Sequence, residues 1–131
     1  MIVVDASALV ELLLQTPVGT RVEKRLERND DEVHAPHLVD IEIAHALRRL
    51  VRMGEVSTPR AEEAIADLLD FDVYRYPHVD LLDRAWTIRA NVTVYDAMYI
   101  ALAEALGAPL LTCDARLSAA PGHSARIELI Q

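Results

Sequence analysis

The stretch IVVDASA, residues 2–8, contains the pattern on which the fold of this chain depends. Residues 2–4 are apolar and β-forming, and they predict a short buried strand. An acid, Asp5, follows this strand at once. Ser7 can then cap a helix expected at residues 8–15, because its hydroxyl can accept a hydrogen bond from a free N–H group of the first turn. The chain therefore begins with a strand, an acid and a helix.

Strands and helices alternate along the rest of the sequence. Further strands are expected at residues 32–35, 72–76, 108–112 and 127–130. Further helices are expected at residues 17–28, 38–52, from 57 onward, at 77–90 and at 93–106. Such alternation predicts an α/β fold, with a parallel sheet of four to five short strands and helices on both faces.

The length and composition fit a single domain over residues 1–131. A chain of this size buries about two-thirds of the surface that it exposes when unfolded. With 52% hydrophobic residues it can form a core unaided. The single cysteine, Cys113, excludes an internal disulfide framework and suits a reducing cytosol. The sequence shows no signal peptide and no apolar run of about 18 residues, so we expect a cytoplasmic protein with no membrane partner.

The charge balance is acidic, with 13 basic and 21 acidic residues and a formal net charge of −8. Affinity for nucleic acid comes largely from neutralising phosphates, so this balance disfavours a general nucleic-acid binder. Any nucleic-acid contact must then be local. Twelve of the basic residues are arginines, which favour bidentate phosphate contacts, although a GC-rich genome would encode the same bias.

Four acids, Asp5, Glu42, Asp96 and Asp114, each interrupt or end an apolar stretch. Asp5 and Asp114 follow expected strands, Asp96 lies in the first turn of an expected helix, and Glu42 lies one turn into another. Ligands of open α/β sheets bind at the carboxyl ends of the strands, so these acids can meet in one cleft. Buried carboxylates need a cation or hydrogen-bond donors, and Mg²⁺ is the natural hard cation for such a set.

Each acid also has a structural alternative. Asp96 stands three residues after Thr93, which is the spacing of a capping box. Asp5 and Asp114 could each cap the helix or turn that follows. Glu42 could lie at a solvated helix edge.

Several other chemistries lack their sequence signatures. The chain has no G-x-S-x-G elbow, no glycine-rich phosphate loop and no cysteine pair. A haloacid-dehalogenase-like phosphatase would carry an acid at the position of Ser7, and a response-regulator receiver would need a lysine after its last strand, whereas the only lysine is Lys24. The five histidines show no metal-ligand spacing.

The segments around the four acids resemble, in order, the four acidic motifs of PIN-domain ribonucleases. The segments are IVVDASA (2–8), VDIEIAHALRR (39–49), YDAMYIALA (95–103) and LTCDARL (111–117). Each motif is weak alone, but the ordered set extends over essentially the whole chain. The compact length, with no added domain, is similar to that of VapC-type toxins from bacterial toxin–antitoxin pairs.

The resemblance implies RNA cleavage that depends on Mg²⁺ or Mn²⁺, with the four acids as catalytic metal ligands, directly or through water. Of the four, Asp114 is the acid whose contribution varies in the family. The hydroxyls of Ser7 and Thr112 would support the ligands. One or two ions can supply the activated water and charge stabilisation that phosphodiester hydrolysis needs, and Asp5 is expected to bridge two ions. The arginines expected near RNA are Arg48, Arg49, Arg52 and Arg116, for each of which a solvated helix face is the alternative.

These features together predict an endoribonuclease toxin. The resemblance also implies a homodimer and a cognate antitoxin, a segment of which blocks the acidic cleft. Two other functions stay open at this point. One is a PIN nuclease of RNA processing with no toxin role. The other is a non-catalytic α/β interaction module in which the acids only cap helices.

Overall fold

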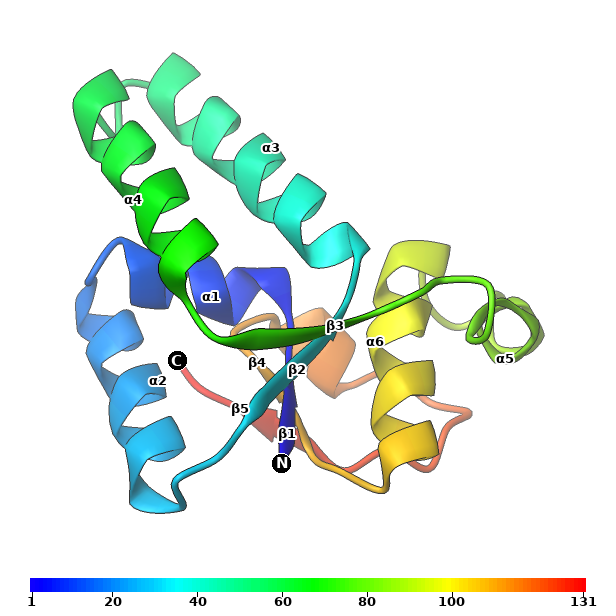
Figure 1. Cartoon of the computed structure of the whole chain (residues 1–131). Coiled ribbons are helices and arrows are strands. Elements are labelled where there is room, and N and C mark those ends of the chain that lie inside the picture. The colour runs from blue at the N-terminus through cyan, green and yellow to red at the C-terminus, as the bar shows by residue number, and fades with distance from the viewer.

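The computed structural model describes residues 1–131, which form a five-stranded parallel sheet between layers of helices (Figure 1). The strand order is β3-β2-β1-β4-β5, and every neighbouring pair is parallel. The strands are β1 (Ile2–Val4), β2 (Val33–Pro36), β3 (Val73–Tyr76), β4 (Leu110–Thr112) and β5 (Ile127–Leu129). The α/β class and the sheet predicted from the sequence are therefore confirmed.

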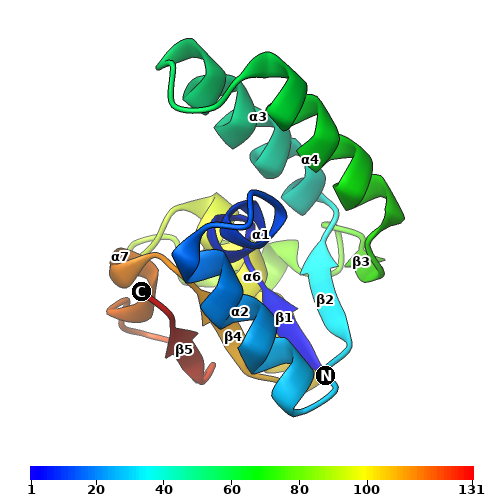
Figure 2. The same cartoon turned by 90° about the vertical axis from the view of Figure 1, so that its left-hand side faces the viewer.

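Helices cover both faces of this sheet, as the sequence predicts. They are α1 (Ala6–Leu13), α2 (Pro17–Arg28), α3 (Leu38–Arg52), α4 (Thr58–Asp70), α5 (Leu82–Thr87), α6 (Val94–Leu106) and α7 (Ala115–Ser118). In Figures 1 and 2, α1 and α2 lie on one face and α6 lies on the other, with α5 beside α6. None of these helices has the length and apolar character that a membrane crossing requires.

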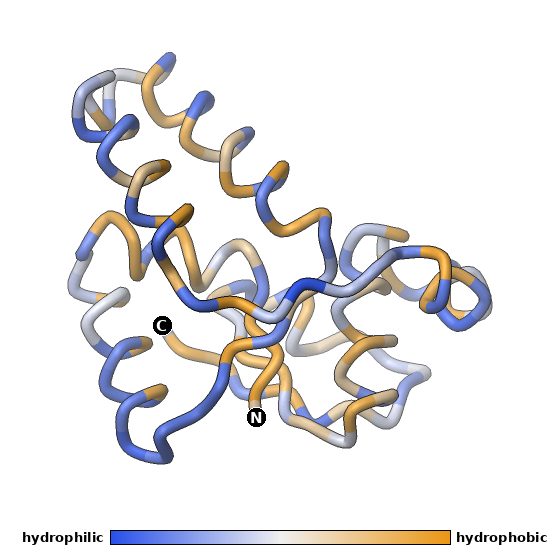
Figure 3. The backbone as a smooth tube through the Cα atoms, in the orientation of Figure 1, coloured by the Kyte–Doolittle hydropathy of each residue, from blue (hydrophilic) through white to orange (hydrophobic).

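The two central strands form the middle of the hydrophobic core. All three residues of β1 and both leucines of β4 are completely buried. Figure 3 shows hydrophobic segments gathered around these strands, whereas the turn between α2 and β2 is hydrophilic. Burying one Val, Leu or Ile side chain stabilises a fold by about 1.5–3 kcal/mol. The carboxyl ends of β1 and β4 are therefore firmly held, and side chains placed there have a rigid base.

Helices α3 and α4 form a hairpin that extends away from the sheet (Figure 2). The first turn of α3 is tied to the loop after β3, because the Leu38 N–H donates to Nε2 of His78 at 2.8 Å. This bond satisfies one of the free N–H groups at the start of the helix. It also fixes the base of the hairpin, which is the part of α3 that carries Glu42.

Two local predictions are corrected by the structure. Asp5 rather than Ser7 is the N-cap of α1, which begins at Ala6, because the Asp5 carboxylate accepts from the Ala8 N–H at 3.1 Å. The helix predicted at residues 77–90 is helical only in α5. The segment before α5 turns instead, and this leaves the His78 ring free to reach α3.

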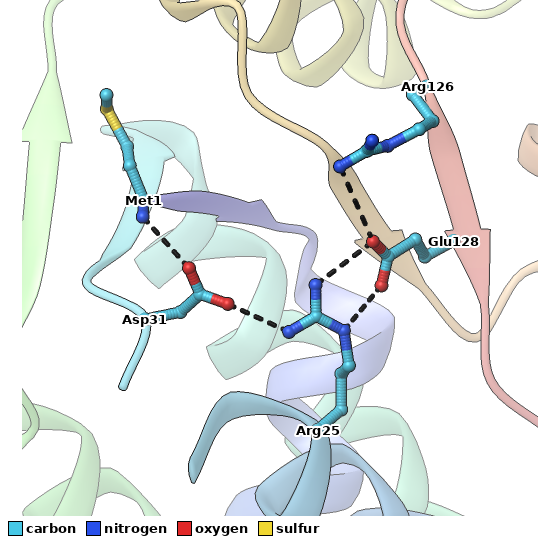
Figure 4. A network of polar contacts seen from close by, with 5 residues as sticks. All are labelled: Met1, Arg25, Asp31, Arg126 and Glu128. Atoms are coloured by element: carbon cyan, nitrogen blue, oxygen red, sulfur yellow. Dashed lines mark hydrogen bonds and ion pairs between the residues drawn. The ribbon is translucent and has the colours of Figure 1, made fainter. Parts of the chain in front are cut away.

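A polar network joins the amino end of the chain to its last strand (Figure 4). Arg25, in the last turn of α2, donates to both carboxylate oxygens of Glu128 on β5, at 2.6 and 3.0 Å. It also donates to Asp31 at 2.8 Å, and Asp31 in turn pairs with the amino group of Met1 at 2.9 Å. The side chains of Arg25 and Asp31 are each only 10% exposed. One guanidinium thus connects α2, the α2–β2 turn and the edge strand.

Replacing Arg25 by alanine is expected to destabilise the protein by about 2–3 kcal/mol, because Asp31 and Glu128 then keep partly buried charges without their partner. Arg28→Ala removes a neighbouring exposed arginine that has no acidic partner, and it is expected to have little effect. Urea unfolding of the two variants measures the difference. Equal stabilities would show that the network in Figure 4 contributes nothing.

Candidate active site at the carboxyl edge of the sheet

Two of the four acids lie at the carboxyl ends of neighbouring strands. Asp5 directly follows β1, and Asp114 lies two residues after β4. From β1 the chain continues to β2 and β3 on one side, whereas β4 and β5 lie on the other side. Such a reversal of strand order opens a crevice at the ends of the central strands, and open α/β sheets bind ligands there. The fold therefore brings these two acids to the expected position of a site.

Asp5 is the most enclosed of the four acids, with only 5% of its surface exposed. Its Oδ1 accepts from the Ser7 hydroxyl at 2.7 Å and from the Ala8 N–H at 3.1 Å, and its Oδ2 accepts from the Thr112 hydroxyl at 2.7 Å. No arginine or lysine pairs with it. Burial raises the pKa of Asp5 despite these donors, and the charge of Asp96 adds to the increase. The carboxylate is thus rigidly oriented but not neutralised.

The two hydroxyls that hold Asp5 also join the two strand ends to each other. The Ser7 hydroxyl accepts from the Cys113 N–H at 3.0 Å, and the Thr112 hydroxyl accepts from the Asp114 N–H at 2.9 Å. The structure thus places Ser7 and Thr112 against the first acid, where the resemblance expects them. Their contribution to metal binding stays a prediction.

Glu42 reaches the same region from the base of α3. Its Oε1 accepts from the hydroxyl of Tyr99 on α6 at 2.7 Å, and the Tyr99 side chain is almost completely buried. Burial raises the pKa of Glu42, and the charges of Asp96 and Asp5 raise it further, against the opposing effect of the Tyr99 bond. The solvated helix edge considered for Glu42 is therefore not what the structure shows.

Helix capping occurs beside both Asp96 and Asp114, without removing either acid from the edge. The Thr93 hydroxyl accepts from the Asp96 N–H at 3.1 Å, so Thr93 caps α6, and hydrogen bonding by Thr93 also opposes the increase in the pKa of the Asp96 carboxyl. Asp114 caps α7, because its Oδ1 accepts from the Arg116 N–H at 2.9 Å. Capping and participation in a site are thus compatible at both positions.

The charges of the four carboxylates act on one another, which indicates that they lie in the same region of the molecule. Burial is the main cause that raises the pKa of Asp96, and the charge of Asp114 is the next. Asp96 in turn raises the pKa of Asp5 and of Glu42. Asp96 therefore interacts with each of the other three acids. A cluster that repels itself in this way attracts a cation.

The donor set suits a hard divalent cation, but its spacing is open. No group of three or more Asp, Glu, His or Cys side chains lies close enough to hold one ion directly. Mg²⁺ commonly uses one or two carboxylates and keeps several waters, so an open carboxylate set of this kind fits it better than it fits Zn²⁺. Carboxylates held by hydroxyl groups and lacking arginine partners, as at Asp5, agree with this interpretation.

The four arginines expected near RNA lie at different places. Arg116 lies at the site, with its side chain 95% exposed and its Nε 3.8 Å from Asp114. Arg48, Arg49 and Arg52 lie in the second half of α3, exposed and without acidic partners. Arg49 follows Glu42 by seven residues, so it lies about 10 Å along the same helix face, whereas Arg48 points away from that face. Arg116 and Arg49 are thus better placed than the other two.

Sequence reasoning missed Tyr99 and His78, which position Glu42 and the start of α3. Tyr99 follows Asp96 by three residues on one helix, and this spacing on a common face was the available signal. His78 carried no such signal, because its partner is a backbone amide 40 residues away. Burial raises the pKa of the Cys113 thiol to about 11, which disfavours the thiolate that a nucleophilic cysteine needs.

Comparison with known proteins agrees with this geometry. The family model described as PIN domain matches residues 2–122. The chain therefore belongs to the PIN-domain family. It is 44% identical to Ribonuclease VapC12 of Mycobacterium tuberculosis, over 99% of each chain. It is 45% identical to Ribonuclease VapC1 of the same species, over 98% of this chain and 97% of the relative. Within the family it belongs with the VapC ribonucleases.

Solved structures show the same architecture. PAE2754 from Pyrobaculum aerophilum superimposes with a TM-score of 0.69 at 29% identity, over 96% of this chain and 81% of that one. VapBC2 from Rickettsia felis, solved bound to a DNA fragment from its promoter, gives a TM-score of 0.72 at 13% identity over the whole of both chains. This second likeness, at so low an identity, concerns the fold alone.

The pH dependence of stability provides a test of the carboxylate cluster. Asp96 has a raised pKa in the folded protein, so the folded state binds its proton more readily than the unfolded chain above the ordinary aspartate value of 3.8. Its contribution to stability is therefore lost as pH rises through its raised pKa. In EDTA, Asp96→Asn is expected to be more stable than the wild type at about pH 8, with the difference shrinking towards about pH 4.

Thermal melts of the two proteins across this pH range measure that difference. Asp31 and Glu128, whose pKa values are lowered, affect both proteins alike and cancel in the comparison. A difference that does not change with pH would mean that Asp96 is not repelled by its neighbours.

Proposed function

We propose that this protein is a divalent-metal-dependent endoribonuclease, with Asp5, Glu42, Asp96 and Asp114 as the carboxylates that hold Mg²⁺ or Mn²⁺. The observation that carries the proposal is the meeting of these four acids, none with a close lysine or arginine partner except Asp114, at the reversal of strand order. A cluster of this kind is costly in a protein that does not bind a cation. The family membership supplies the substrate class.

Each residue of the proposed site has a role that follows from its position. Two hydroxyls and a backbone N–H hold Asp5, so its carboxylate is oriented before a metal ion binds. Tyr99 orients Glu42 through a hydrogen bond. The charge of Asp96 raises the pKa values of both Asp5 and Glu42. When bound, a divalent ion supplies the Lewis acid for hydrolysis of a phosphodiester. Arg116 and Arg49 are the proposed contacts to RNA phosphates on the two sides of the acids.

The metal requirement gives the direct test of this activity. The purified protein is expected to cleave single-stranded RNA in Mg²⁺ or Mn²⁺ and to lose all cleavage in excess EDTA. Adding back Mg²⁺ should restore it. Cleavage that persists undiminished in EDTA would rule out the metal mechanism.

We also propose that a cognate antitoxin neutralises the protein in the cytoplasm and that the protein forms a homodimer. The chain offers apolar surface beside Glu42, because the neighbouring Ile41 on α3 is 73% exposed. A partner segment could cover this surface and place an arginine among the carboxylates. Two structural neighbours with the same fold are VapBC2 from R. felis, bound to a promoter DNA fragment, and a toxin–antitoxin complex from Klebsiella pneumoniae.

Expression in a bacterial host is expected to arrest growth, and the product of a small adjacent gene should relieve the arrest by binding the protein. Normal growth, together with RNA cleavage in vitro, would instead favour a nuclease of RNA processing with no toxin role. An inactive Asp96→Asn variant distinguishes RNA damage from a nonspecific burden of expression.

Removing the Tyr99 hydroxyl tests how Glu42 is positioned. Tyr99→Phe keeps the buried ring but leaves Glu42 without its donor, so metal affinity is expected to fall about 10- to 100-fold. The cost in stability should stay near 1 kcal/mol. Titration of Mn²⁺ by calorimetry measures the affinity, and Tyr95→Phe, which changes an exposed tyrosine on the same helix, is the matched control. Equal affinities in the two variants would remove Tyr99 from the site.

A further inference from the structure

A second cleft adjoins the carboxylate cluster on the side of α7. It has a volume of about 480 Å³ and lies between the loop from α5 to α6 and the start of α7. Asp96 belongs to its lining, together with Arg89, Asn91, Thr93 and Arg116. The cleft is therefore continuous with the proposed site but carries two arginines of its own.

In a chain whose net charge is −8, arginines without acidic partners are the groups available to bind an anion. Arg25, Arg75 and Arg84 each form close, bidentate pairs with carboxylates and are not available to another anion. Arg89 has no carboxylate within 4.0 Å, and Arg116 has only the long 3.8 Å contact with Asp114. The cleft thus concentrates positive charge that the rest of the protein does not neutralise.

Arg89 is also held in place. Its guanidinium donates to the Trp86 carbonyl at 2.8 Å and lies over the Trp86 ring, 4.3 Å from the ring centre. The Trp86 side chain is 58% exposed, so part of its ring is available to contact another molecule. A fixed guanidinium beside an exposed aromatic ring combines the two elements that bind single strands, a phosphate contact and a stacking surface.

The wall of the cleft is shaped by a close approach of two loops. Gly122 has φ of +86°, and a Cβ there would collide with the side-chain amide of Asn91. The left-handed φ favours glycine here, and the Asn91 side chain would have to move to admit a Cβ. The segment around Gly122 therefore lies against the side chain of Asn91 in the α5–α6 loop.

We propose that this cleft binds the single-stranded RNA segment adjoining the scissile phosphate, with Arg89 and Arg116 contacting backbone phosphates and Trp86 stacking on a base. The inference rests on the proposed ribonuclease function and assigns part of its substrate site. It explains how a strongly acidic protein can hold an RNA strand next to four carboxylates. Arg89 and Arg116 lie on the α7 side of the acids, and Arg89 is kept there by its contacts with Trp86.

The test uses a fluorescein-labelled pool of single-stranded RNAs about 12 nucleotides long, bound in EDTA so that cleavage does not interfere. Arg89→Gln and Arg116→Gln are each expected to weaken binding about tenfold and to reduce the slope of log affinity against log salt by about 0.7. Trp86→Leu should weaken binding about fivefold or more with the slope unchanged. Arg28→Gln, which removes an exposed arginine of α2, is the control for net charge and should match the wild type.

Cleavage in Mg²⁺ separates this inference from the proposed function. Arg89→Gln should raise KM with little change in kcat. If the wild type cleaves RNA and Arg89→Gln matches Arg28→Gln in affinity and salt slope, the cleft is not the RNA site although the protein is a nuclease. If the wild type neither binds nor cleaves RNA under any metal condition, the proposed function itself fails. If Trp86→Leu or Arg89→Gln shifts the protein between monomer and dimer, the surface is an interface between copies and the inference is overturned.

Discussion

Asp96→Asn is expected to reduce RNA cleavage by more than about a hundredfold, since even residues that only support metal ligands cost about 10- to 100-fold when changed. Asp96 is the acid that interacts electrostatically with each of the other three. Its replacement removes one charge from the centre of the cluster and leaves the α6 cap, which uses the Thr93 hydroxyl and a backbone N–H, intact. Initial rates on a labelled RNA in Mg²⁺ measure the loss.

The matched control is Asp67→Asn, an exposed aspartate on α4 away from the sheet edge. It changes net charge by the same amount and should keep full activity. Circular dichroism should show both variants folded. If the cleavage rate of Asp96→Asn stays within about twofold of that of Asp67→Asn, the carboxylate cluster is not the catalytic centre, because the loss of a metal ligand reduces activity by much more than twofold.

Mg²⁺ is expected to raise the melting temperature of the wild type by about 10 °C at a hundredfold excess over its dissociation constant. Binding to the folded state alone adds about 2.7 kcal/mol at that excess, and 1 kcal/mol is worth about 3–5 °C in a domain of this size. The increase should be largely lost in Asp5→Asn and Asp96→Asn. Differential scanning fluorimetry over a series of Mg²⁺ concentrations measures it.

One other acidic region could bind Mg²⁺ and must be separated from the site. A larger cleft, about 880 Å³, lies at the amino edge of β2 and β3 and is lined by Glu23, Glu27, Asp30, Asp31, Glu32, Asp70 and Asp72. Its acids are held differently from Asp5, because Asp31 is already paired with Arg25 and with the amino group of Met1. The combined variant Glu27→Gln/Asp72→Asn should leave the Mg²⁺ shift intact. If the melting-temperature shift disappears in this combined variant, or persists in Asp96→Asn, the ion binds in the amino-edge cleft and not at the four carboxylates. No shift at all would favour the interaction module without catalysis.

Most of the architecture could be predicted because it depends on local patterns. Short apolar runs predicted all five strands, and the acids that follow β1 and β4 could be placed at one sheet edge before any coordinates existed. The strand order could not be obtained in this way, since it depends on which strands pair over long distances. That order is what makes the ends of β1 and β4 neighbours. The sequence also indicated that Asp5 and Asp114 could cap helices. It could not show whether an acid that caps a helix also belongs to the site.

The parts that escaped prediction depend on contacts between distant segments. Tyr99 supports Glu42 across 57 residues, and Thr112 supports Asp5 across 107. The helix predicted after β3 begins only at Leu82, and the turn before it carries His78, whose ring accepts from the Leu38 N–H 40 residues away. Arg89 lines the same cleft as Asp96 because of how the α5–α6 loop packs, and the sequence does not reveal this packing. Local periodicity carries no information about any of these partners.

The central claim is that Asp5, Glu42, Asp96 and Asp114 hold divalent metal, directly or through water. Its most direct test is a crystal of the protein soaked in Mn²⁺, with anomalous scattering recorded at the manganese edge. The account predicts an anomalous peak among these carboxylates, at the carboxyl ends of β1 and β4, and no such peak in crystals of Asp96→Asn. A wild-type crystal of a protein that cleaves RNA, with Mn²⁺ bound elsewhere and none at this edge, would contradict it.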